Sequence, residues 1–223
     1  MVKAETNLEK FLSSKQFESY EKKNPESAKE ISEFLRAFII KYQSIPGVDV
    51  VFKRLADETK GNSSELKWFN IFSQIRCTNF LLEKGFKINR LEAEKNGSVL
   101  DIKFINGKYC DIKSFLPRER DNVAIGWSQD EIVIKKFAEE KIQTAFLLQG
   151  ADTLVIDDIF SENGSKYRFL SYFFGFIKNK ASSRFNIMIK HMDIYLPRMI
   201  VVRFVNSISK NPKIVFKGEL FNA

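Results

Sequence analysis

Two aspartates and a lysine lie in a short stretch of sequence with strand-like patterning. Asp101 follows the apolar pair Val99-Leu100, and Asp111 and Lys113 stand two positions apart in Cys110-Asp-Ile-Lys113. Side chains alternate along a strand, so Asp111 and Lys113 share one face of theirs. Hydrolysis of a phosphodiester needs hard carboxylate oxygens for a divalent metal and positive charge against the reacting phosphate. These residue types suit that chemistry.

Glu65 is a further candidate, near the start of a predicted helix over residues 62–84 that ends at Gly85. Its spacing to Phe72 and the other apolar residues of this helix puts Glu65 on the inward face, which favours a pocket. Glu65 also stands three residues after Asn62, so completion of a helix-capping box is the alternative interpretation.

Three short strands are predicted after this helix, joined by turns at Asn96-Gly97 and Asn106-Gly107. They are expected at Phe86–Glu92, Val99–Ile105 and Lys108–Phe115. Because the connections are short, the strands should form an antiparallel meander.

The turn at Asn106-Gly107 decides whether the two aspartates meet. A regular two-residue turn would put them on opposite faces of the hairpin. A three-residue loop with the glycine left-handed instead pairs Phe104 with Lys108 and sets Asp101 opposite Asp111. We therefore predict the bulged, three-residue turn.

A glutamate on a helix, an aspartate on a strand and an acidic-x-Lys tripeptide on the next strand follow one another here. In this order residues 62–150 resemble the PD-(D/E)XK nuclease superfamily. The resemblance implies a restriction-endonuclease-like α/β fold, with a mixed β-sheet flanked by helices. It implies a Mg²⁺ site, with Mn²⁺ as a substitute, whose ligands are Glu65, Asp101 and Asp111. Lys113 would orient the attacking water.

The pattern departs from the family name at Leu100, where the name has proline, and at Asp111, where many members have glutamate. A rival register takes Glu92 or Glu94 as the first acid and Asp101-Ile-Lys103 as the second acid and the lysine. We rank this register second, because a helix rather than another hairpin should follow the motif strand.

Residues 1–60 are predicted to form a polar helical annex, ahead of a nuclease-like domain over residues 61–223. Asn24-Pro25 makes a suitable N-cap and first-turn pair for one of its helices. Ile45-Pro46-Gly47 should break that helix, and another is expected over residues 48–60. The annex would serve dimerisation or substrate binding.

The second half of the chain is predicted to complete the sheet. Thr144–Gln149 is expected as a buried strand after a helix capped by Ser128, which indicates a crossover connection. The remaining expected elements are a helix over residues 167–178 and strands over residues 186–190, 199–205 and 213–220.

Composition favours a globular protein with a polyanionic partner. The chain of 223 residues is 44% hydrophobic with 22 Phe, which predicts one core rich in aromatic rings. Its net charge of +8 favours nucleic acid. Arg118 and Arg120 could bind phosphates, or could pair with neighbouring acids. Two cysteines and one histidine, His191, provide neither a disulfide framework nor a zinc ligand set, and both cysteines are expected in the core.

The sequence thus predicts a Mg²⁺-dependent DNA endonuclease of restriction, recombination or repair type, with RNA open as a substrate. The alternative is a non-catalytic nucleic-acid-binding or assembly protein that keeps a nuclease-like fold. No long apolar run or secretory signal is present, so a soluble cytoplasmic protein without a membrane partner is expected.

Overall fold

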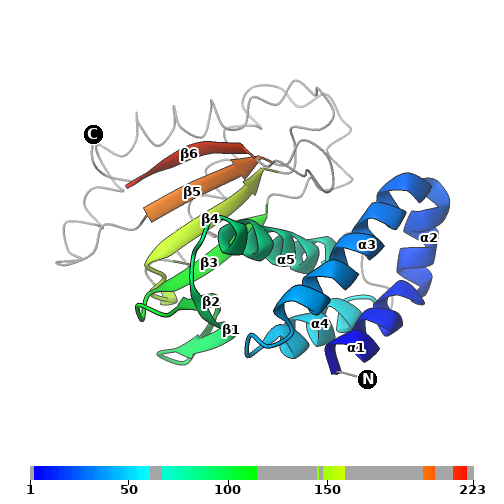
Figure 1. Ribbon diagram of the computed structural model, residues 1–223, viewed down its shortest axis with the longest axis horizontal. Coiled ribbons are helices and arrows are strands. Elements are labelled where there is room, and N and C mark those ends of the chain that lie inside the picture. The colour runs from blue at the N-terminus through cyan, green and yellow to red at the C-terminus, as the bar shows by residue number, and fades with distance from the viewer. Residues whose placement is uncertain are drawn as a thin grey trace.

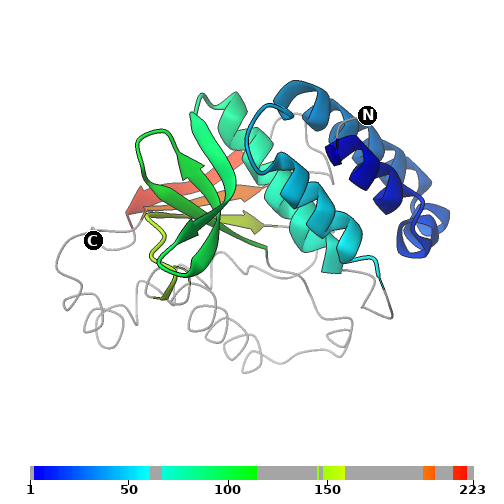
Figure 2. The same cartoon turned by 90° about the horizontal axis from the view of Figure 1, so that it is seen from below.

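The computed structural model describes residues 3–60, 67–114, 148–158, 198–203 and 213–219, together with Ala145. Within this part of the chain, five α-helices precede a sheet of six strands. The four N-terminal helices gather on one side of the molecule, and α5 lies between them and the sheet (Figures 1 and 2). The predicted mixed α/β architecture is confirmed.

Residues 3–60 are mainly helical, as predicted. The helices are α1 (Lys3–Leu12), α2 (Lys15–Lys23), α3 (Pro25–Tyr42) and α4 (Val48–Asp57). Asn24 is the N-cap residue of α3 and Pro25 lies in its first turn, as predicted, although the Asn24 side chain makes no capping hydrogen bond to α3. Asn24 also ends α2, and its Nδ2 donates to the Tyr20 carbonyl at 3.3 Å.

Helix α5 (Lys67–Glu83) is buried on nearly all sides. Aromatic rings of α1 and α2 surround Trp68, with Phe11 in edge contact at 5.3 Å between ring centroids. On the other side, Arg76 forms a buried ion pair with Asp157 of the sheet. The helix ends before Gly85, as predicted, and the φ of Gly85 is +84°, a left-handed conformation that often follows the end of a helix.

The sheet keeps the strands in chain order, from β1 to β6. Neighbouring strands are antiparallel except for the parallel pairs β3–β4 and β4–β5. The strands are β1 (Ile88–Lys95), β2 (Ser98–Phe104), β3 (Tyr109–Ser114), β4 (Thr153–Asp158), β5 (Arg198–Arg203) and β6 (Lys213–Glu219). The predicted meander is confirmed, as are the two predicted strands that correspond to β5 and β6.

The strand predicted at Thr144–Gln149 is wrong at the residues of this segment that the structure describes. Ala145 and Leu148 are in π-helical conformation, and Leu148 is 75% exposed. Gly150, with φ +69°, comes shortly after Leu148. The buried strand that pairs in parallel with β3 is β4 instead. The apolar run of Thr144–Gln149 is compatible with helical conformation as well as with a strand, so periodicity alone did not separate the two.

One continuous hydrophobic core extends from α1 through α5 to β4, across the predicted boundary at residue 60. Cys77 and Cys110 are free and buried within it, as expected. Burial raises the pKa of both thiols, so they remain neutral core groups. Within the described residues, no helix combines the length and apolar character needed to cross a membrane.

Candidate active site

The turn between β2 and β3 is the bulged, three-residue type predicted from the sequence. The Phe104 amide donates to the Lys108 carbonyl at 2.8 Å, and Gly107 has a φ of +80°. Ile102 pairs with Cys110 in this register. Extending the same register by one residue sets Asp101 opposite Asp111.

Asp101 and Asp111 converge on a single backbone amide. The Ile112 N–H is within 2.6 Å of Asp101 Oδ2 and 3.1 Å of Asp111 Oδ1. The paired residues of β2 and β3 are Ile102–Cys110 and Lys103–Tyr109. Beyond them the Asp101 carboxylate takes the place of a backbone acceptor for the Ile112 amide. The hairpin therefore opens where its two carboxylates meet.

Lys113 completes a compact set of charges. Its Nζ lies 2.6 Å from Asp111 Oδ2, and the lysine side chain is 21% exposed. Burial and the neighbouring Asp111 carboxylate raise the pKa of Asp101 well above its usual range, while Lys113 opposes that shift. The two carboxylates are held closer together than their mutual repulsion favours.

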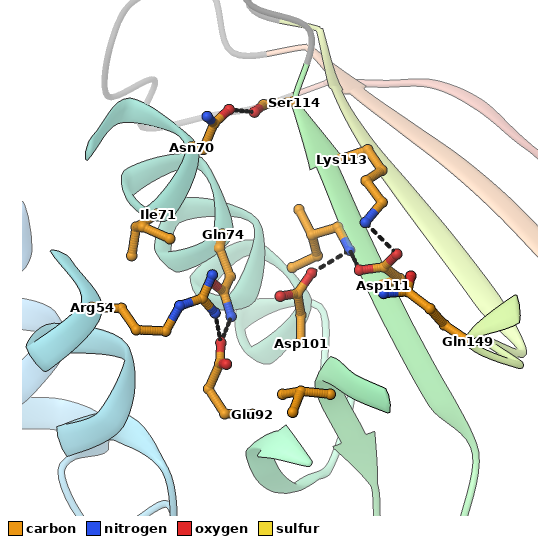
Figure 3. Close-up of a pocket in the computed structure, with 12 residues that line it drawn as sticks. Arg54, Asn70, Ile71, Gln74, Glu92, Asp101, Asp111, Lys113, Ser114 and Gln149 are labelled. Carbon is orange, nitrogen blue, oxygen red and sulfur yellow. Dashed lines mark hydrogen bonds and ion pairs between the residues drawn. The ribbon is translucent and has the colours of Figure 1, made fainter. Parts of the chain in front are cut away.

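These residues line a cleft of about 550 Å³ between α5 and the opened hairpin. Figure 3 shows Asp101 in the space between α5 and β3, with Asp111 and Lys113 beside it on β3. Asn70 and Gln74 line the cleft from α5, and further lining residues are Arg54, Ile71, Glu92, Val99, Ile112, Ser114 and Gln149. The cleft thus joins the hairpin, α5 and the N-terminal helices.

Glu92 provides a third carboxylate in this cleft. Leu91 pairs with Ile102 and Ala93 with Leu100, so Glu92 stands opposite Asp101 and the three acids form a row across β1–β3. Glu92 Oε1 accepts hydrogen bonds from Arg54 Nη1 and Gln74 Nε2, both at 2.5 Å. Its φ of +51° is left-handed, a conformation that costs a residue other than glycine about 1 to 3 kcal/mol.

Sequence reasoning considered Glu92 only within the rival register and missed Arg54, Gln74 and Gln149. The rival lysine, Lys103, is not among the residues that line the cleft, where its ammonium group would be needed. It lies over the ring of Tyr109, 5.3 Å from the centroid. Arg54 and Glu92 are 38 positions apart, so no local spacing could have revealed their contact.

The other predicted site residues, Glu65, Arg118 and Arg120, lie outside the described residues, as does His191. The roles predicted for them stay predictions. The choice between a capping and an active-site role for Glu65 is among these.

The described residues offer oxygen ligands of the kind that Mg²⁺ prefers. Asp111 Oδ2 and Gln149 Oε1 are buried and have no well-directed hydrogen-bond donor within the described part of the chain. Asp101 adds a carboxylate beside them. In the described ranges, no group of three or more His, Cys, Asp or Glu is arranged to hold a metal ion. Because Mg²⁺ commonly binds through one or two carboxylates with water and substrate phosphate, this donor set fits it.

Comparisons of the chain with protein-family models, with curated proteins and with solved structures give no match.

Proposed function

We propose that this protein is a metal-dependent nuclease that hydrolyses phosphodiester bonds in DNA. The observation that carries the proposal is the convergence of Asp101 and Asp111 on the Ile112 amide, next to the Lys113 ammonium group. This is the charge arrangement that the resemblance to PD-(D/E)XK nucleases implies, and the proposal includes a restriction-endonuclease-like fold for the chain. The net charge of +8 supports a nucleic acid as the partner.

Each residue has a separate role in this proposal. Asp101 and Asp111, with Glu65, would hold Mg²⁺ or Mn²⁺, which when bound supplies a Lewis acid and lowers the pKa of nearby water. Lys113 would orient the attacking water and offset negative charge on the phosphate. The Ile112 N–H keeps both carboxylates in place before any substrate arrives. Such preorganisation avoids the cost of gathering like charges during the reaction.

The test is cleavage of linear, supercoiled, single-stranded and four-way-junction DNA with Mg²⁺ or Mn²⁺. We expect Asp111→Asn and Lys113→Ala each to lose at least about 100-fold in cleavage rate, with an unchanged fold by circular dichroism. The matched control is Lys23→Ala, which alters another acidic-x-Lys tripeptide, Glu21-Lys23, on the exposed side of α2. Full cleavage by the two cleft variants would contradict the proposal.

Titration of Mg²⁺ into the purified protein separates a nuclease from a protein that only binds nucleic acid. We expect calorimetric heats of Mg²⁺ binding in the wild-type protein and much weaker binding in Asp111→Asn. A non-catalytic binder would show salt-dependent DNA affinity without such a metal site. Matched DNA and RNA substrates in the cleavage assay then identify the preferred nucleic acid.

A further inference from the structure

Arg54 brings positive charge from the N-terminal helices into the cleft. It belongs to α4, whereas Lys113 belongs to β3, and Figure 3 shows them on either side of Asp101. The Arg54 side chain is 43% exposed. Within the described residues, Nη1 donates to Glu92, and the other guanidinium nitrogens donate to no protein group. Donors therefore remain for a ligand in the cleft.

A side-chain contact and a backbone contact together fix the position of Arg54. Glu92 is only 7% exposed and accepts from both Arg54 and Gln74, so helix α5 helps to hold the anchoring carboxylate. The turn before α4 is attached to the neighbouring residue of β1, since the Leu91 amide donates to the Pro46 carbonyl at 2.8 Å. A side chain held in this way loses little further freedom when it binds.

The cleft also needs this charge to accept a polyanion. Its described charged groups are the carboxylates of Glu92, Asp101 and Asp111 and the cations Arg54 and Lys113. Lys113 is already paired with Asp111. Arg54 is paired with Glu92 in turn, but a guanidinium group carries five N–H donors against three on an ammonium group, and it binds phosphate oxygens through two parallel hydrogen bonds.

We propose that Arg54 binds a backbone phosphate of the nucleic acid substrate, and that Glu92 is the positioning residue that holds it. This inference rests on the proposed nuclease function and names a contact of the same cleft. It gives the N-terminal helices a part in substrate binding.

The experiment measures the affinity of a fluorescent DNA duplex by anisotropy, in EDTA, over a series of salt concentrations. Each phosphate contact contributes about 0.9 to the slope of log affinity against log salt. We expect Arg54→Ala to lower that slope by about one and to weaken binding by about three- to tenfold. Arg54→Lys, which keeps the charge, should restore most of the slope.

The matched control is Arg36→Ala, which breaks the ion pair with Glu9 on the N-terminal helices. Those two side chains are 51% and 50% exposed, so this variant also removes one cation and leaves one glutamate unpaired. If Arg54→Ala matches Arg36→Ala in slope and affinity, the inference is overturned and Arg54 only connects α4 to β1. Arg54→Gln, which can still donate to Glu92, gives the same test if Arg54→Ala fails to fold.

The same measurements distinguish this failure from failure of the nuclease proposal. A wild-type protein that binds and cleaves DNA, with Arg54→Ala equal to the control, overturns the Arg54 contact alone. A wild-type protein that neither binds nor cleaves DNA overturns both.

Discussion

The amide of Ile112 is a single donor shared by two carboxylates, and this has an energetic cost for the folded protein. Asp101 has a raised pKa because it is buried beside Asp111. Between the usual aspartate pKa, about 3.9, and this raised value, the folded state binds more protons than the unfolded state. Stability must therefore fall as pH rises through that interval.

We predict that Asp101→Asn is more stable than the wild-type protein at pH 7 to 8. The amide keeps an oxygen that can accept from Ile112 but removes the repulsion with Asp111. The melting temperature should rise by at least about 2 °C, the shift that corresponds to roughly 1 kcal/mol in a chain of this size. Thermal unfolding across pH 4 to 8, without divalent metal, measures the difference, which should shrink toward pH 4.

Asp57 provides a control, because its pKa is shifted in the opposite direction to that of Asp101. A hydrogen bond from Lys60 lowers the pKa of Asp57, so its ionised form stabilises the fold, and that stabilisation is lost as pH falls through its pKa. Asp57→Asn should therefore give no increase in melting temperature at neutral pH. If Asp101→Asn lowers the melting temperature at pH 7 to 8, the interpretation of the carboxylate pair is wrong.

At the scale of elements, α5 is attached to the sheet by a buried ion pair. Arg76 donates through Nε and Nη2 to the two carboxylate oxygens of Asp157 on β4, at 2.6 and 2.7 Å. The side chains are 3% and 0% exposed. Ser73 Oγ also donates to Asp157. The carboxylate is therefore held by two residues of the helix that lines the cleft.

We predict that Arg76→Met lowers the free energy of unfolding by about 3 to 5 kcal/mol, because it leaves a buried carboxylate without its counter-ion. Urea unfolding of the purified protein measures this. The double variant Arg76→Met/Asp157→Leu should recover much of the loss, since it removes both charges. Equal losses in the single and double variants would mean that packing around Arg76 matters more than its charge.

Local patterns predicted the elements of the site better than its surroundings. The Asn106-Gly107 turn left two registers open, and the observed one was predicted because only it sets Asp101 opposite Asp111 in the expected site. β4 was missed because its ends, Thr153 and Asp158, are polar and atypical of a buried strand. β4 pairs with β3 on one side and with β5 on the other, and this placement depends on contacts distant in sequence.

At the scale of the whole molecule, the N-terminal helices are attached to the sheet through a close approach at Gly47. A Cβ atom there would lie 2.2 Å from the Leu91 carbonyl oxygen, and the φ of Gly47 is +92°. Both features exclude a side chain. Glycine at this position therefore lets the turn between α3 and α4 contact β1 directly.

We predict that Gly47→Ala destabilises the protein by about 2 to 4 kcal/mol, by combining backbone strain of about 1 kcal/mol with displacement of the helices from β1. Gly97→Ala is the matched control, because its φ is +78° but nothing lies within 4 Å of the added Cβ. It should lose only about 1 kcal/mol in urea unfolding. Equal losses for both glycines would show that the contact with Leu91 tolerates a methyl group.

The order of strands in the sheet has a consequence for synthesis of the chain. Because spatial order follows chain order, α1–α5 and β1–β3 emerge from the ribosome before β4 exists. Until then β3 is an open edge, and it carries Cys110 and Ile112, which are buried in the finished fold. Exposed apolar edges pair readily with other chains. Truncations that end between residues 114 and 153 should therefore aggregate, although they contain Asp101, Asp111 and Lys113.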